Sequence, residues 1–171
     1  RGLGVVAAAA ALTACSSTNE AVNQALIEGA VGGIVAADCK IGRMTYWAAN
    51  ATVPVYEISF RIVMTNVSSK PVTLSGDNFA TTLDGTPIPP FNFSARDVGD
   101  ADIWRTYDSL TIRPGEERSI ALAYEISQPT YDSWYKSSRT VAVSFTCGNQ
   151  RVTYTKNSRS DEITVSDIET L

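Results

Sequence analysis

Hydrophobic and polar residues change their spacing twice along this chain of 171 residues. Residues 2–12 form one uninterrupted run of apolar and small side chains. Residues 17–37 then space their apolar positions as one broad face of a helix does, and from residue 38 onward apolar and polar residues alternate as they do in β-strands. The pattern therefore divides the chain into three parts: a leader over 1–14, a partly helical tether over 15–37 and a β-rich domain over 38–171.

The alternation in the third part predicts strands separated by turn residues. Asp84-Gly85 is a strong signal for a β-hairpin, and Pro114-Gly115 indicates a type I or II turn. Residues 86–102, rich in proline and then in aspartate, are expected to form a long loop. The expected strands are residues 40–47, 53–66, 72–74, 79–83, 103–112, 118–126, 139–147, 151–155 and 163–165.

Short strands with no helix between them predict an all-β fold, an antiparallel β-sandwich of about seven to nine strands. A closed barrel is the alternative. The uneven lengths of the connections favour the open sandwich.

The tether is expected to carry its apolar residues, from Val22 to Val35, on one side of a helix. Gly29, Gly32 and Gly33 weaken that helix, because glycine in a helix interior costs about 1 kcal/mol relative to alanine. The segment is interpreted as a partly helical spacer, or as a helix that docks on a partner.

The end of the leader resembles the lipobox of bacterial lipoproteins, in the residues Leu12-Thr13-Ala14-Cys15. The eleven apolar residues before it suit the core of a signal peptide and are too few for a membrane span. The resemblance implies cleavage after Ala14, covalent lipid on Cys15 and a membrane anchor in the bacterial cell envelope. Ser16 is compatible with sorting to the outer membrane in a Gram-negative organism. The alternative is a buried N-terminal helix of a cytosolic protein.

A second resemblance is to the telokin-like, immunoglobulin-like domain of many bacterial surface lipoproteins. It covers about residues 38–147 and consists of strand and turn signals, so it implies the fold and no catalytic residue. The segments that carry it are Phe60-Arg61-Ile62-Val63-Met64-Thr65-Asn66-Val67-Ser68-Ser69-Lys70-Pro71-Val72, Leu83-Asp84-Gly85 and Leu110-Thr111-Ile112-Arg113-Pro114-Gly115-Glu116.

Composition excludes several classes of function. The formal net charge of -4 and the pI near 4.8 argue against binding to nucleic acid. The chain has no histidine, so it cannot supply a Ser-His-Asp or Cys-His mechanism. A hydrolase with paired carboxylates remains a minor alternative, although no such pair can be located. We expect a protein that is not an enzyme.

Cys39 and Cys147 would be the two cysteines left after lipidation of Cys15. They stand at predicted strand ends of an exported domain, so we expect a disulfide between them. Two free buried thiols are the alternative.

Carboxylates and aromatic side chains are the remaining candidates for binding. Asp97, Asp100 and Asp102 could supply oxygen ligands to calcium, although their spacing matches no EF-hand, and we expect no resident cofactor beyond the lipid. Exposed tryptophan and tyrosine on a rigid scaffold commonly anchor partners. The candidate contacts with a partner are Trp104, Tyr131, Trp134 and Tyr135.

The function expected is therefore a non-catalytic, lipid-anchored binding or structural module that docks on another envelope protein or complex. The alternative is a solute- or carbohydrate-binding lipoprotein that uses loop aromatics and aspartates.

Overall fold

The computed structural model describes residues 30–46, 54–90, 92–97, 104–165 and 168–171. Nearly all of this part of the chain is strand or turn, and every strand pair is antiparallel. The first sheet has the order β1 (Ala30–Val31), β2 (Ile34–Tyr46), β3 (Val55–Asn66), β10 (Glu117–Ile126), β7 (Asn92–Asp97) and β8 (Arg105–Thr106). The second has the order β13 (Ile163–Val165), β12 (Gln150–Asn157), β11 (Thr140–Cys147), β5 (Phe79–Leu83) and β6 (Thr86–Ile88).

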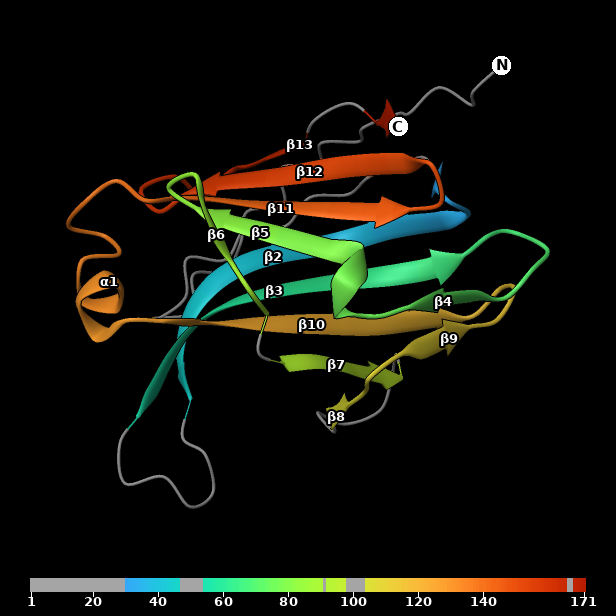
Figure 1. Ribbon diagram of the computed structural model, residues 1–171, viewed down its shortest axis with the longest axis horizontal. Helices are drawn as coiled ribbons and strands as arrows, with labels where there is room; N and C mark the ends of the chain where they lie inside the picture. The colour runs from blue at the N-terminus through green and yellow to red at the C-terminus, as the bar shows by residue number, and fades with distance from the viewer. Residues whose placement is uncertain (1–29, 47–53, 91, 98–103, 166–167) are drawn as a thin grey trace.

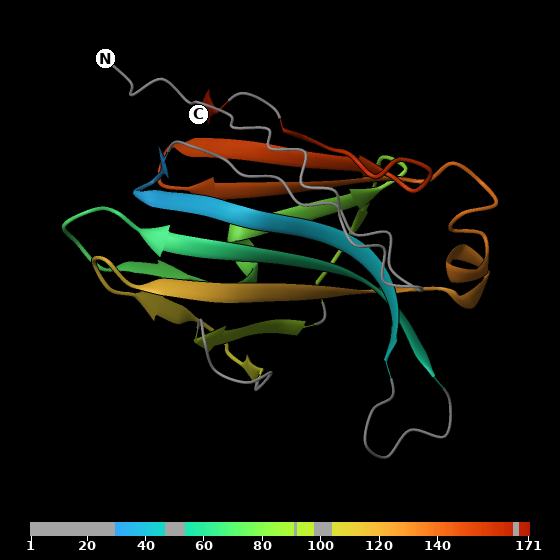
Figure 2. The ribbon, with the colours of Figure 1, turned by 180° about the vertical axis from the view of Figure 1, so that it is seen from behind.

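Three smaller pieces complete the described fold. β14 (Glu169–Thr170) also pairs with β12, and β4 (Val72–Leu74) pairs with β9 (Leu110–Ile112) in a separate two-stranded sheet. Two short helices, η1 (Gly76–Asn78) and α1 (Gln128–Asp132), lie in connections. Figures 1 and 2 show the two sheets as two layers, with α1 at one end and the turns that follow β3 and β9 at the other.

The core lies between the two sheets and is built from the alternating apolar positions. Phe60 of β3 lies opposite Leu122 of β10, and both are fully buried. From the second sheet, the ring of Tyr154 lies 5.5 Å from that of Phe60, and the rings of Phe79 and Phe145 are 5.1 Å apart. Burial of this apolar area, at roughly 25 cal/mol per Å², dominates the stability of such a fold. The antiparallel sandwich predicted from the sequence is confirmed, and the two sheets remain separate instead of closing into a barrel.

Two predicted turns are confirmed in detail. Asp84 and Gly85 both have positive φ, 50° and 81°, and they form the two-residue connection between the paired residues Leu83 and Thr86. This is the conformation that an Asp-Gly hairpin requires. At the other turn, the Glu116 amide donates to the Arg113 carbonyl over 3.0 Å, with Gly115 at φ 77°, as in a type II turn.

The helical tether predicted for residues up to 37 is wrong from Ala30 onward. β1 and β2 form a hairpin through Gly32-Gly33, and β2 pairs with β3 from its first residue, Ile34 opposite Asn66. Gly32 and Gly33, which weaken a helix, have the positive φ angles that a tight turn requires. The hydrogen bonds of β2 with β3 outweigh the helix-like spacing of apolar residues in this segment. The β-domain therefore begins at least eight residues before the predicted boundary at residue 38.

The long loop predicted for residues 86–102 is also wrong in part, because it contains β6 and β7. Pro87 is tolerated in β6, since this strand lies at the edge of its sheet and a missing amide donor costs little there. In β7, Phe93 and Ala95 point into the core. The single strand expected over 103–112 is divided into β8 and β9, and the described strands number fourteen, several of two or three residues.

Candidate functional site

The aromatic segment that follows β10 closes one end of the core. Ser127 caps α1 by accepting a hydrogen bond from the Thr130 amide, and Pro129 lies in its first turn. The chain then turns so that Trp134 is fully buried. The prediction that Trp134 contacts a partner is therefore wrong, because its large apolar ring is more stable in the core than in water.

Tyr131 and Tyr135 of this segment lie on either side of Arg43, a residue that no pattern in the sequence singles out. The guanidinium carbon of Arg43, from β2, lies 4.2 Å from the ring centre of Tyr131 and 4.9 Å from that of Tyr135. Nη1 of Arg43 also donates to the Tyr131 carbonyl over 2.9 Å. The ring of Tyr56 lies 4.6 Å from that of Tyr131. We call Arg43, Tyr56, Tyr131 and Tyr135 the Arg43–tyrosine cluster.

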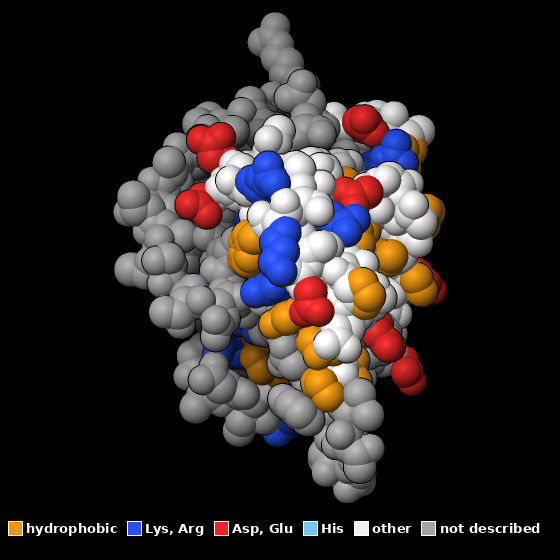
Figure 3. All heavy atoms as spheres, turned by 90° about the vertical axis from the view of Figure 1, so that its left-hand side faces the viewer, with side chains coloured by type: hydrophobic (Ala, Val, Ile, Leu, Met, Phe, Trp, Pro, Cys, Tyr) orange, Lys and Arg blue, Asp and Glu red, His pale blue; other side chains and the backbone are white. Residues whose placement is uncertain are grey.

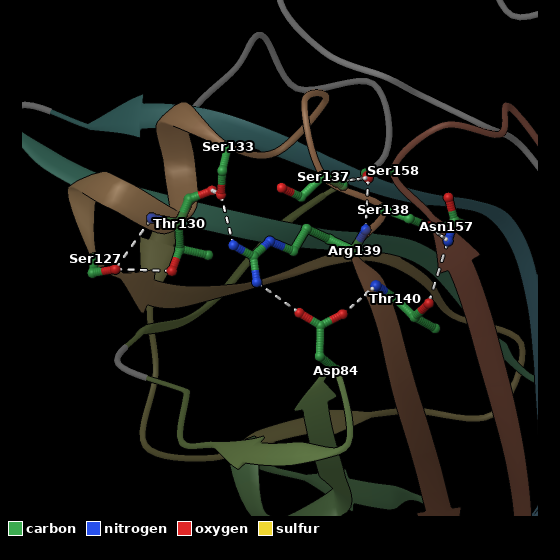
Figure 4. A network of polar contacts seen from close by, with 10 residues as sticks. All are labelled: Asp84, Ser127, Thr130, Ser133, Ser137, Ser138, Arg139, Thr140, Asn157 and Ser158. Atoms are coloured by element: carbon green, nitrogen blue, oxygen red, sulfur yellow. Dashed lines mark hydrogen bonds and ion pairs between the residues drawn. The ribbon is translucent and has the colours of Figure 1, made fainter.

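A polar network fixes this end of the sandwich (Figure 4). Asp84 accepts hydrogen bonds from the Thr140 amide over 2.8 Å and from Arg139 Nη1 over 3.0 Å, and Arg139 Nη2 donates to Ser133 Oγ over 2.7 Å. The Thr140 amide is the main cause that lowers the pKa of Asp84, with Arg139 adding to it. The network therefore links the β5–β6 hairpin to the segment after α1.

The end of the sandwich that carries α1 has a mixed surface (Figure 3). Lys and Arg side chains form a column in the middle of this face, with Asp and Glu on both sides and hydrophobic side chains below. Tyr135 is 41% exposed, one of three large hydrophobic residues with substantial exposure in the described part of the chain. This end of the sandwich therefore combines side chains of both charges, hydrophobic side chains and one partly exposed aromatic ring.

A second feature is a pocket on the outer face of the first sheet, the side that faces away from the second sheet. We call it the basic pocket. Its volume is about 170 Å³. Trp104, one of the aromatic residues predicted to contact a partner, lines this pocket. The Arg96 guanidinium lies 5.2 Å from the centre of its ring. The residues that give the basic pocket its chemistry are Asp38, Lys40, Arg61, Arg96, Trp104 and Ser119.

A β-bulge shapes the rim of the basic pocket. The register between β2 and β3 shifts between Ala37 and Lys40, and the extra residue Asp38 has φ 50°. This insertion keeps Cys39 facing the core while Lys40 points to the outer face, directly opposite Arg61. Alternation in β3 predicts that Arg61 faces away from the core, but nothing in the sequence indicates that Lys40 and Arg96 lie close to it.

The predicted disulfide between Cys39 and Cys147 is not formed, and both cysteines are free and buried. Cys147 lies against the β1–β2 turn, where its thiol contacts the Gly32 carbonyl at 3.7 Å. Cys39 is not at a strand end, because β2 begins at Ile34. Cys39 lies five positions along the strand from Ile34, roughly 16 Å, whereas a disulfide requires Cα atoms within about 7 Å. Burial raises the pKa of both thiols.

The other predicted sites fall largely outside the described residues. Cys15, Asp100 and Asp102 lie there, as does the side chain of Asp97, whose backbone ends β7. Within the described ranges, no three Asp, Glu, Cys or His side chains are grouped to hold a metal ion. Nor does any helix in those ranges have the length and apolarity needed to cross a membrane.

Comparison with known proteins gives no family for this chain. No protein-family model matches it, and no curated protein does. The fold is similar to a functionally unknown protein from Listeria monocytogenes EGD-e, with a TM-score of 0.43 and 12% identity over 74% of this chain and 73% of that one. It is also similar to a protein from Archaeoglobus fulgidus, with a TM-score of 0.34 and 12% identity over 83% and 98%. Neither likeness is close enough to indicate a function.

Proposed function

We propose that this protein is a non-catalytic, lipid-anchored binding module of the bacterial cell envelope, which docks on another envelope protein through the end of the sandwich that carries α1. The lipobox-like residues Leu12-Thr13-Ala14-Cys15 support the anchor. An anchor of several acyl chains keeps a domain at the membrane, since each buried methylene contributes about 0.8 kcal/mol. The domain then meets partners in a thin layer beside the membrane.

The order of the strands supports an immunoglobulin-like module. In constant-type immunoglobulin domains one sheet has the order A-B-E-D and the other contains C, F and G. Here β2-β3-β10-β7 corresponds to A-B-E-D, and β5-β11-β12 corresponds to C-F-G. Such sandwiches serve many functions, so the partner must be argued from the surface.

The observation that carries the docking proposal is the Arg43–tyrosine cluster. Tyrosine, tryptophan and arginine are the residues that most often dominate binding energy at protein interfaces. Arg43 holds the rings of Tyr131 and Tyr135 in place, and Trp134 lies with its ring edge-on to Tyr135, 6.3 Å between ring centres. Because these rings are already ordered, binding would cost little side-chain entropy.

The test is affinity purification from detergent-solubilised membranes with the tagged full-length protein. We expect one partner in stoichiometric yield with the wild type, and loss of most of it with Tyr135→Ala. Val67→Ala is the matched control, because Val67 is 59% exposed and follows the opposite end of β3 from Tyr56. Recovery of the wild type alone would refute the docking, and equal losses in both variants would refute this surface.

The anchor is tested separately by the intact mass of the membrane-extracted protein. Cleavage before Cys15 and the added mass of acyl chains are expected, and both should be lost in Cys15→Ala. A protein recovered with its amino-terminal alanines and no acyl mass would refute the anchor.

The second candidate function is binding of a solute or carbohydrate. Of the residues expected to serve it, Trp104 lines the basic pocket, whereas Trp134 is enclosed in the core. A glycan array, and thermal unfolding with and without calcium, would test it. A response to sugars that disappears in Trp104→Ala would favour this function over docking.

A further inference from the structure

The segment that carries Tyr135 is fixed by hydrogen bonds from the end of β12. Asn157 Nδ2 donates to Ser138 Oγ over 2.6 Å, and Ser158 Oγ donates to the Ser137 carbonyl over 3.3 Å (Figure 4). The polar network described above holds the start of the same segment. A surface whose backbone is already ordered loses little conformational entropy when a partner binds to it.

The same connection brings two cationic residues together. Nη2 of Arg159 donates to the Lys136 carbonyl over 2.6 Å, and both residues are exposed. Arg139, their neighbour at this end, is paired with Asp84. Neither Lys136 nor Arg159 forms an ion pair with a carboxylate in the part of the chain that the structure describes. The two residues therefore present to solvent positive charge that no carboxylate of the described fold neutralises.

Tyr135 lies directly before Lys136 and adds apolar area to these charges. Its ring is 41% exposed. Tyrosine and arginine are enriched at protein interfaces, because they combine apolar contact area with directional hydrogen-bond donors. We call Tyr135, Lys136 and Arg159 the Tyr135–Arg159 surface.

Exposed carboxylates occupy nearby positions of the chain. Asp132 ends α1, and Asp161 and Glu162 follow Arg159. Figure 3 shows this end of the sandwich with Lys and Arg in the middle and Asp and Glu on both sides. A bilayer of acidic lipids is negative over its whole surface, so these carboxylates would repel it. One acidic side chain of a protein can instead be placed opposite the cations alone.

From these features we infer that the partner presents an aspartate or glutamate beside an apolar residue, received by Lys136 and Arg159 and by the ring of Tyr135. The inference rests on the docking proposed above and names the chemistry of the partner at that surface. One N–H of Arg159 is used by the Lys136 carbonyl, and the others match the geometry of a carboxylate, to which Lys136 adds a point charge. The flanking carboxylates repel a partner whose charge is out of register.

The test is affinity purification of the tagged full-length protein from detergent-solubilised membranes, followed by cross-linking with a carbodiimide. This reagent joins a lysine amine to a carboxylate in contact with it, with loss of water, so mass spectrometry of the product identifies the acidic residue that faces Lys136. We expect an amide bond between Lys136 and an aspartate or glutamate of the captured protein. Capture should also weaken several-fold when the salt concentration rises from about 0.1 M to about 0.5 M, because salt screens exposed charges.

Charge variants locate the contact. Lys136→Gln and Arg159→Gln should each weaken capture about tenfold, since each removes a charged hydrogen-bonding group. Lys136→Arg keeps the charge, so it should keep capture and lose the cross-link. The matched controls are Lys70→Gln and Arg113→Gln, which change exposed cations in the β3–β4 and β9–β10 turns at the opposite end and should leave capture unchanged. Urea unfolding of each variant shows that it is folded, and Lys136→Gln serves if Arg159→Gln is not.

Three results would overturn the inference. These are capture that is unchanged in both Gln variants, a captured protein with no cross-link to Lys136, and binding of the unacylated Cys15→Ala protein to phosphatidylglycerol vesicles that is lost in Lys136→Gln. Capture that depends on Tyr135, together with any of these results, would leave the docking proposal standing while this inference fails. Recovery of no partner at all would overturn both.

Discussion

Replacing Gly32 by alanine tests the most consequential difference between the sequence prediction and the structure, the β1–β2 hairpin. Gly32 has φ 57°, and a Cβ atom there would lie 2.5 Å from the Cys147 sulfur and 2.7 Å from the Cys147 carbonyl oxygen. The left-handed conformation costs an alanine about 1–2 kcal/mol. The overlap with a buried strand adds about 1–3 kcal/mol, since backbone on β11 cannot move away cheaply.

We therefore expect Gly32→Ala to lower the free energy of unfolding by about 2–5 kcal/mol, measured by urea denaturation of the purified protein. Gly115→Ala is the matched control. Gly115 also has positive φ, 77°, but no atom lies within 4 Å of the position that a methyl group would take there, so only the conformational cost of about 1–2 kcal/mol applies.

The difference between the two variants in free energy of unfolding isolates the contact of the β1–β2 turn with Cys147. If residues 30–37 were a helical or mobile tether, Gly32→Ala would be neutral or slightly stabilising, because alanine favours helix over glycine by about 1 kcal/mol. A loss no larger than that of Gly115→Ala would refute the packing of this hairpin.

Three further predictions concern the cysteines, the core and a buried carboxyl. Under denaturing, non-reducing conditions Cys39 and Cys147 should each take up one alkyl group. In the native protein both should react slowly, because burial raises the pKa of their thiols. Failure to alkylate after unfolding would show that a disulfide is present. Trp134→Ala should destabilise the fold by about 3–5 kcal/mol, and Tyr135→Ala, at an exposed ring, by much less; similar losses in urea unfolding would contradict the burial of Trp134. Burial raises the pKa of Glu57 to about 7, against the attraction of Arg61 that lowers it. Between pH 4.5 and 7 the folded state keeps a proton on Glu57 that the unfolded chain has lost, so the free energy of unfolding should decrease as pH rises through this range. Glu57→Gln should reduce that decrease by about 1–2 kcal/mol. The same pH profile of stability in the variant and the wild type would contradict the raised pKa.

The sequence alone determined the local features of the fold. Alternation in β10 and β11 identified these strands and the side of each that is buried, because successive side chains of a strand point to opposite faces. Asp84-Gly85 and Pro114-Gly115 identified their turns, because few residues adopt the required dihedral angles. From these signals the all-β sandwich followed.

Tertiary structure decided every feature that depends on which strands are neighbours. Residues 34–39 became strand because β3 offers them a partner, and the same early start of β2 separates Cys39 from Cys147. Trp134 is enclosed because the chain after α1 folds over the open end of the core. Arg43 meets Tyr131, and Lys40 meets Arg61 and Arg96, only through the order and pairing of strands within the first sheet. The local sequence determines which segments form strands and which side of each strand is apolar. The contacts between distant segments that form a site depend on the register and the order of the strands.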